Sequence, residues 1–110
     1  IYKLYNDVSS LIRNSFVRGG YKKTSKTYKI IGCSFEYLKL HLESKFEHWM
    51  NWENKGLYNG ELNYGWDIDH IIPLSSANSE EDIITLNNYK NLQPLCSYVN
   101  RYIKRDKLTT

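Results

Sequence analysis

The chain has 110 residues, 41% of them hydrophobic and 25% charged, with a formal net charge of +3. This composition is typical of one small globular domain, and the absence of an apolar run of about 18 residues argues against a membrane protein. The opening "IYKLYNDVSSLIR" lacks the basic stub and apolar block of a signal peptide, so we expect a cytoplasmic protein of a bacterial or phage-infected cell. The chain begins at Ile1, as a fragment or a processed form would.

The charges are segregated along the chain. Residues 1–33 carry seven basic groups against Asp7, residues 34–89 carry three lysines against ten acids, and residues 90–110 carry five basic groups against Asp106. Two basic ends around an acidic middle predict contact with a polyanion outside and with a cation inside. A solvated surface shows the same runs of charge, so charge alone leaves nucleic-acid binding open.

The first half of the chain reads as helical. Apolar residues at helical spacing predict a helix over 2–17, which "GG" at 19–20 ends. The polar and basic stretch 21–32 is expected to be an exposed loop. A second helix should run from its cap Ser34 to about Trp49, followed by a long turn region over 50–65 that is rich in Gly, Asn and aromatic residues.

The second half alternates strands and helices. "WDIDHII" over 66–72 predicts a strand that Pro73 limits, and "NSEEDIITLNN" predicts a short helix from the cap Ser79 to Asn87. "NLQPLC" reads as a second short strand, and "SYVNRYIKRDK" as a final helix capped by Ser97. The expected order is therefore strand, long loop, strand, helix.

The first of these strands carries the chemistry. Asp67 and Asp69 should point to one face and His70 to the other, unless the strand ends near His70. Asp69 can ligate a hard divalent cation, while a neutral His70 can take a proton from water. A strand-strand-helix fold would bring the side-chain oxygen of Asn100 toward Asp69 and place Asn91 at the start of the second strand. Taken singly, an Asp or Asn here is more typical of a turn or a cap.

The segments "DIDHIIPLS", "YKNLQPLC" and "NRYIKRDK", in this order, resemble the HNH nuclease family, and the upstream stretch 30–56 is similar to small phage and mobile-element HNH endonucleases. The resemblance implies a single α+β domain over 1–110. Its ββα-metal (HNH) core would span 64–107, with helical, basic residues 1–50 packed around it. It also implies that Asp69 and Asn100 bind the metal, that His70 is the general base, and that Asn91 holds the loop and orients the base.

The implied activity is hydrolysis of DNA phosphodiester bonds with one divalent cation, Mg²⁺ or Mn²⁺, with Zn²⁺ and Ni²⁺ as alternatives. Asp67 either supports the metal ligands or faces solvent. No small-molecule cofactor is implied, and a homodimer is expected only if both strands of a duplex are cut. The predicted DNA contacts are basic residues of the final helix and of the loop after the first helix: Arg101, Lys104, Arg105, Lys22, Lys23 and Lys26.

Two alternatives stay open from the sequence. One is a non-catalytic nucleic-acid-binding module on an HNH scaffold, and the other is a nuclease that acts mainly on RNA or on branched substrates. His41 and His48 lack a third ligand, so they do not predict a second metal site. The residues Asp69, His70, Asn91 and Asn100 together favour an active site over an inactive scaffold.

Overall fold

The structure is a computed structural model that describes residues 2–104. Three α-helices precede the first strand, and a further α-helix lies between the two strands. In chain order the elements are α1 (Tyr2–Arg18), α2 (Thr27–Ile31), α3 (Phe35–Glu43), β1 (Trp66–His70), the 3₁₀ turn η1 (Leu74–Ser76), α4 (Glu80–Leu86), the 3₁₀ turn η2 (Tyr89–Asn91), β2 (Leu92–Cys96) and the π-helix η3 (Val99–Lys104).

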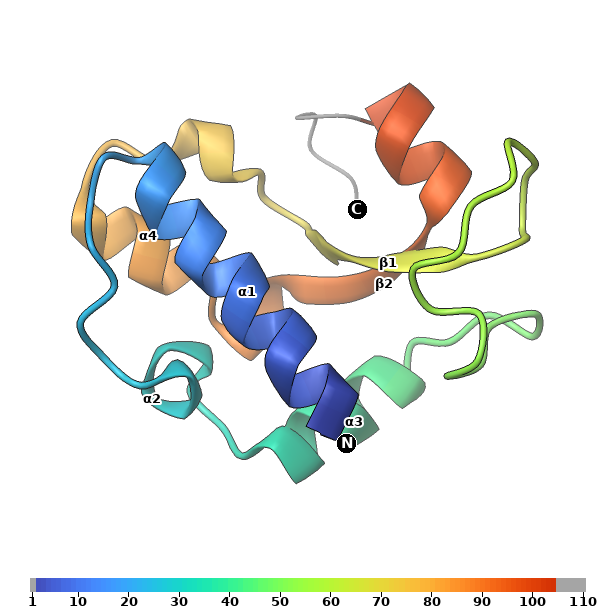
Figure 1. Cartoon of the computed structure of the whole chain (residues 1–110), viewed down its shortest axis with the longest axis horizontal. Coiled ribbons are helices and arrows are strands. Elements are labelled where there is room, and N and C mark those ends of the chain that lie inside the picture. The colour runs from blue at the N-terminus through green and yellow to red at the C-terminus, as the bar shows by residue number, and fades with distance from the viewer. Residues whose placement is uncertain (1, 105–110) are drawn as a thin grey trace.

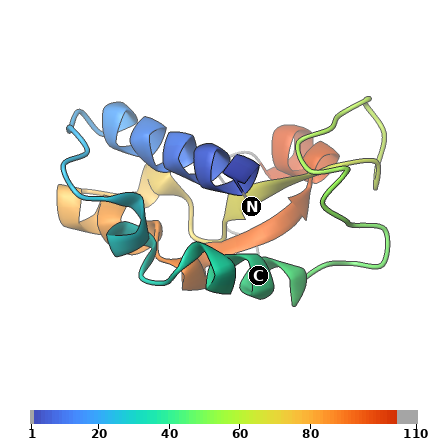
Figure 2. The same ribbon diagram turned by 60° about the horizontal axis from the view of Figure 1, so that its bottom comes forward.

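The two strands form an antiparallel hairpin at the centre of the molecule. Trp66 pairs with Cys96 at one end of the hairpin, and His70 pairs with Leu92 at the other. Helix α1 covers one side of the hairpin and α3 the other, as Figures 1 and 2 show from two directions. The chain is thus an α+β domain with a small two-stranded sheet between helices.

The main core lies where α1, α2, α3 and α4 meet the hairpin. Val8 and Ile12 of α1, Leu38 and Leu42 of α3, and Leu92 of β2 are fully buried there. Their spacing along α1 and α3 is the three-to-four-residue repeat that places side chains on one helix face. Burial of this face stabilises both helices and holds α1 against the strands.

Much of the predicted secondary structure is confirmed. Helix α1 ends one residue beyond the prediction, and α4 is capped as expected by Ser79, whose Oγ accepts a hydrogen bond from the amide of Asp82 at 3.1 Å. Strand β1 ends at His70, two residues before the predicted end. The order strand, long loop, strand, helix is also found in the structure.

Two predictions for the first half of the chain are wrong. The expected loop over 21–32 contains the helix α2, which buries Ile30 and Ile31 and ends at Gly32, with a φ of 77° that favours glycine. The second helix stops at Glu43 and not near Trp49. The amides of the next two residues after Ser44 bond three residues back, which tightens the chain into a turn.

The final helix also differs from the prediction. It is a π-helix over Val99–Lys104, and Ser97 already lies in the helical turn that precedes it, so Ser97 is not the expected cap. In a π-helix each amide bonds to the carbonyl five residues back, one residue farther than in an α-helix. No helix in residues 2–104 is long and apolar enough to cross a membrane.

Candidate functional site

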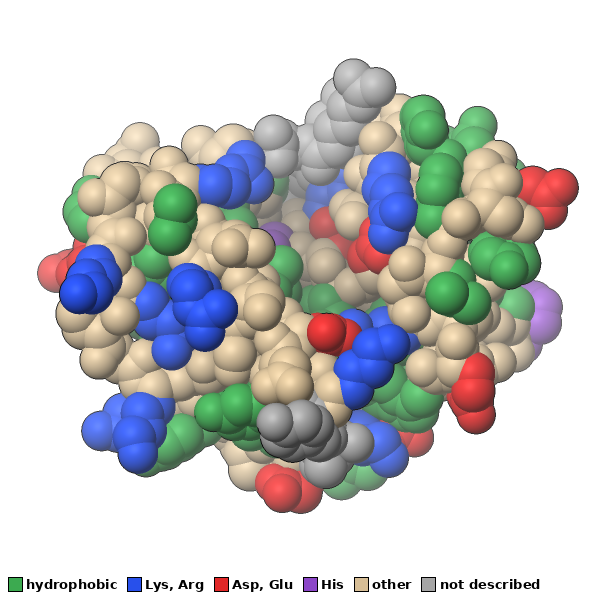
Figure 3. All heavy atoms as spheres, in the orientation of Figure 1, with side chains coloured by type: hydrophobic (Ala, Val, Ile, Leu, Met, Phe, Trp, Pro, Cys, Tyr) green, Lys and Arg blue, Asp and Glu red, His purple; other side chains and the backbone are tan. Residues whose placement is uncertain are grey.

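A cavity of about 380 Å³ lies where α1, the end of β1 and η3 meet. Asp69, His70 and Asn100 all line it, so the structure brings together three of the four residues that the sequence singled out. Figure 3 shows this side of the molecule, where a histidine and acidic side chains lie at the bottom of a hollow that lysine and arginine side chains flank.

Asp69 is buried and forms an ion pair with the buried side chain of Lys104. Its Oδ2 accepts a hydrogen bond from the Lys104 ammonium at 2.5 Å and another from Gln93 Nε2 at 2.9 Å. The same ammonium also donates to the backbone carbonyl of His70. Lys104 is only 3% exposed and Asp69 6%, so this ion pair is shielded from solvent. In this structure Lys104 therefore contacts the carboxylate that was predicted to bind metal, and a phosphate contact would require it to leave Asp69.

Asp67 holds the other end of η3. Its Oδ2 accepts a hydrogen bond from Asn100 Nδ2 at 3.1 Å, and both of its oxygens accept hydrogen bonds from the Arg101 guanidinium at 2.9 and 3.0 Å. Burial raises the pKa of Asp67, but the bonds from Arg101 and Asn100 outweigh it, so the pKa lies below its ordinary value. Asn100 thus bonds to Asp67 while it lines the cavity beside Asp69.

His70 is held by a chain of buried hydrogen bonds that reaches α1. Its Nε2 lies 2.7 Å from Asn87 Oδ1, and Asn87 Nδ2 donates to Ser15 Oγ at 2.8 Å and to the Ile83 carbonyl at 2.9 Å. Ser15 Oγ in turn donates to the carbonyl of Ile12 at 2.6 Å. Asn87 is completely buried, which is why all of these groups need partners.

These hydrogen bonds determine which ring nitrogen of neutral His70 carries the proton. The Ile83 carbonyl can only accept, and Ser15 Oγ has given its proton to Ile12, so both face the NH₂ group of Asn87. The Asn87 oxygen must then face His70, and the shared hydrogen must belong to His70 Nε2. Neutral His70 therefore keeps Nδ1 as the nitrogen that can accept a proton.

The surroundings of His70 favour its neutral form. Burial lowers the pKa of His70 below its ordinary value, and the positive charges of Lys104 and Arg18 lower it further. The hydrogen bond to Asn87 and the charge of Asp69 act in the opposite direction and are outweighed. A neutral imidazole at pH 7 can act as a proton acceptor.

Asn91 fastens the chain that leaves β1. It lies in η2 just before the second strand, and its Oδ1 accepts a hydrogen bond from the amide of Ile72 at 2.9 Å. Its Nδ2 donates to the carbonyls of Ile72 at 3.1 Å and Leu86 at 2.8 Å. Asn91 thus ties the two ends of the long loop together but does not line the cavity with His70.

The predicted DNA contacts lie in different places. Arg101 is exposed, pairs with Asp67, and has its guanidinium 5.0 Å from the ring centroid of Tyr58. Lys23 and Lys26 line a separate cavity of about 560 Å³ beside Arg13, and Lys22 is exposed next to them in sequence. Arg105 lies outside the described residues. The basic residues therefore do not form one cluster around His70 in the part of the chain that the structure describes.

Two residues near His70 were not found by sequence reasoning. Asn87 was identified only as the end of a helix, and Arg18 only as one basic residue among seven in 1–33. Asn87 does end α4, and its side chain then turns to His70. No spacing in the sequence links Arg18 or Asn87 to His70, because the contacts come from packing of α1 and α4 beside β1.

The comparisons with known proteins found no match that would assign this chain to a family. It matches no protein-family model, no curated protein sequence and no solved structure. The functional argument therefore depends on the geometry of the cavity and its residues.

Proposed function

We propose that this chain is a divalent-metal-dependent endonuclease of the HNH type, with a ββα-metal core, that hydrolyses DNA phosphodiester bonds. The observation that carries the proposal is the cavity in which His70, with Nδ1 as its proton-accepting nitrogen, lies beside Asp69 and Asn100. A base that can activate water, and a carboxylate and an amide that can hold a cation, are groups suited to hydrolysis of a phosphodiester.

The residues present fit a hard cation. The ammonium of Lys104 already bonds to two oxygens, those of the Asp69 carboxylate and the His70 carbonyl, so this position accepts positive charge. No group of three or more His, Cys, Asp and Glu side chains able to hold a metal is found in residues 2–104. Mg²⁺ and Mn²⁺ need few protein ligands, because water and phosphate oxygens complete their coordination.

Asp69 and Asn100 would hold the cation, which would stabilise negative charge on the phosphate and on the leaving oxygen. His70 would remove a proton from the attacking water through Nδ1. Asn87 would keep the Nε2 proton in place, so that the imidazole cannot present the wrong nitrogen. Asn91 would fix the loop that follows His70 and thereby the position of the base.

The DNA backbone would be held by basic residues that reach the open surface. Lys23 and Lys26 line the cavity of about 560 Å³ beside Arg13, with Lys22 exposed next to them in sequence. Arg101 lies beside the aromatic ring of Tyr58. Phosphate contacts of this kind position a duplex without reading its sequence.

A plasmid-nicking assay tests the proposal. Purified protein is incubated with supercoiled plasmid in separate reactions with Mg²⁺, Mn²⁺, Zn²⁺, Ni²⁺ or EDTA, and His70→Ala is assayed beside wild type. We expect cleavage with Mg²⁺ or Mn²⁺, none with EDTA, and a loss of about a hundredfold or more in His70→Ala, because a general base contributes at least that much. His48→Ala is the matched control, since His48 is exposed and belongs to neither cavity.

Each alternative has its own signature. Salt-sensitive binding of DNA without cleavage in any of the four metals would favour a non-catalytic binding module. Cleavage of a structured RNA or a branched DNA, with the plasmid left intact, would favour a different substrate. Full turnover by His70→Ala would refute the role of His70 as the base.

A further inference from the structure

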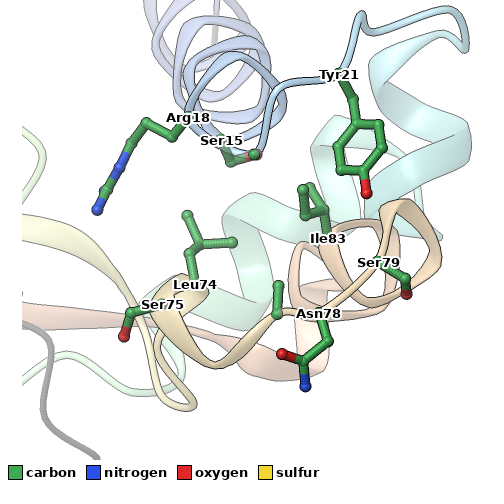
Figure 4. A pocket seen from close by; sticks show the side chains of 10 residues that line it. Ser15, Arg18, Tyr21, Leu74, Ser75, Asn78, Ser79 and Ile83 are labelled. Carbon is green, nitrogen blue, oxygen red and sulfur yellow. The ribbon is translucent and has the colours of Figure 1, made fainter.

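A second cavity, of about 440 Å³, lies beside the first. Figure 4 shows it between the end of α1, η1 and the start of α4. The two cavities share three lining residues, Ser15, Arg18 and Leu74, so they adjoin at these side chains. A molecule whose reacting phosphate lay beside His70 would therefore extend into the second cavity.

Arg18 supplies positive charge to both cavities. It is exposed at the end of α1, and no ion pair of its guanidinium is found among residues 2–104. Figure 4 shows the guanidinium at the strand side of the second cavity, away from Tyr21. An arginine without an acidic partner, between a cavity with a base and a second cavity, is suited to bind a phosphate.

The rest of the second cavity is suited to a base and a sugar. Tyr21 is 38% exposed, and in Figure 4 its ring stands at the end opposite Arg18, near Ile83. Leu74 and Ile83 give the cavity apolar wall, and Asn78 adds an exposed side-chain amide at its rim. An accessible aromatic ring with apolar neighbours is the surface on which an unpaired base stacks.

The size of the cavity limits what can enter. Cavities of about 300 to 1,000 Å³ hold small molecules of roughly nucleotide size, whereas a base pair inside a duplex cannot leave its stack without being unpaired. The end of α1 also lies close against α4: a Cβ on Gly19 would come within 2.4 Å of the Ile83 side chain. There is therefore room for one nucleotide and not for the width of a duplex.

We infer that the second cavity binds one unpaired nucleotide next to the phosphate that is cut, with Arg18 on a phosphate and Tyr21 against the base. This inference rests on the nuclease proposal and adds a substrate class to it: DNA with an unpaired nucleotide beside the cleavage point. Such a nucleotide does not have to be extracted from a stack, so it enters the cavity at a lower energetic cost than a paired one.

The test is a binding measurement without divalent metal, so that cleavage does not intervene. Fluorescence anisotropy compares a 20-base-pair duplex with the same duplex carrying one bulged nucleotide in its centre. We expect wild type to bind the bulged duplex about tenfold more tightly, which is within the range for stacking of one base on an aromatic side chain. Tyr21→Ala should remove this preference, while Tyr21→Phe, which keeps the ring, should retain it.

One control variant and two further measurements make the result specific. Tyr37→Ala removes another exposed tyrosine, 51% exposed and on α3, and should leave the preference unchanged. Arg18→Ala should weaken binding to both duplexes. It should also reduce the slope of log affinity against log salt concentration by about one unit, because one phosphate contact is lost. With 2-aminopurine as the bulged base, its fluorescence should change on binding to wild type and not on binding to Tyr21→Ala.

Equal affinity of wild type for the two duplexes, or a preference that survives in Tyr21→Ala, would overturn the inference. Metal-dependent plasmid cleavage in that case would leave the nuclease proposal intact. Absence of binding to any DNA would contradict both proposals.

Discussion

The two ends of strand β1 are built on opposite principles. At one end, the fully buried Trp66 packs against Phe46 and Trp52, with ring centroids 5.0 and 5.4 Å away. At the other end, three and four residues away, Asp69 and His70 are buried among polar partners, chiefly Lys104 and Asn87. One end is an aromatic cluster, and the other is a network of charges and hydrogen bonds.

The difference separates stability from chemistry. Burial of aromatic rings contributes to folding, and the indole N–H of Trp66 keeps a partner because it donates to the Asn51 carbonyl at 2.6 Å. A buried ion pair must first recover the cost of removing two charges from water, so it is weak evidence for stability and expensive to break. The aromatic end of β1 therefore contributes to the stability of the fold. The polar end contributes less to stability and holds Asp69 and His70 in a fixed arrangement.

The largest effect on folding is expected from Lys104→Met, which leaves the Asp69 carboxylate buried without its cation. We expect a loss of about 3–5 kcal/mol in the free energy of unfolding, measured by urea denaturation without metal. The double variant Asp69→Asn with Lys104→Met should recover most of this loss, because no buried charge remains.

Added Mn²⁺ should stabilise Lys104→Met more than wild type, because the cation binds the carboxylate that the ammonium has left. Lys39→Met is the matched control: its pair with Glu43 is exposed, at 3.5 Å, and should contribute no more than about 0.5 kcal/mol. A loss of less than 1 kcal/mol in Lys104→Met would show that the pair with Asp69 is not a buried one.

At the aromatic end, Trp66→Ala should also lower the free energy of unfolding by about 3–5 kcal/mol, because it removes a fully buried ring. The nicking rate per folded molecule should stay near that of wild type, since Trp66 does not line the cavity of His70. Circular dichroism in urea gives the stability, and the folded fraction scales the activity. A decrease in this rate as large as that of His70→Ala would show that the two ends of β1 are not independent.

A smaller loss is expected when the orientation of His70 is released. Asn87→Ala removes the hydrogen-bond partner of both His70 Nε2 and Ser15 Oγ. We expect it to lower the free energy of unfolding by about 1–3 kcal/mol. Nitrogen NMR should show wild-type His70 with its proton on Nε2, and a mixture of tautomers in the variant. Asn59→Ala, at an exposed loop position, should change neither quantity. An unchanged His70 spectrum in Asn87→Ala would contradict the assignment of the tautomer.

The smallest effect is the pH dependence of stability that His70 brings. Because its pKa is lowered in the folded state, the unfolded chain binds more protons below the ordinary value of 6.5. Stability is therefore complete above pH 6.5 and falls as the pH decreases from there toward the folded pKa. The difference in unfolding free energy between wild type and His70→Ala, measured from pH 8 to 5, should shrink in this window. If the difference in unfolding free energy grew as the pH fell, the pKa of folded His70 would be raised and not lowered.

The sequence by itself determined the long helix α1, the short helix α4 with its cap Ser79, and the order of strand, loop, strand and helix. It also selected Asp69, His70 and Asn100, which line one cavity. The predicted elements depend on local rules, namely the spacing of apolar residues, the caps and the alternation along a strand. Such rules act over a few residues and can be applied without knowing the fold. The site residues were selected from their chemistry, from the expected strand-strand-helix arrangement and from the resemblance to the HNH family.

Only the tertiary structure decided which groups these residues contact. Lys104 bonds to Asp69 and Asn100 bonds to Asp67 because the fold returns η3 to a position where its side chains reach β1. Asn87 reaches His70, and Arg18 lies between two cavities, because α4 and the end of α1 meet beside the hairpin. These contacts join residues 17 to 72 positions apart, where no local pattern applies, and packing of the whole chain sets which polar groups must share the buried space.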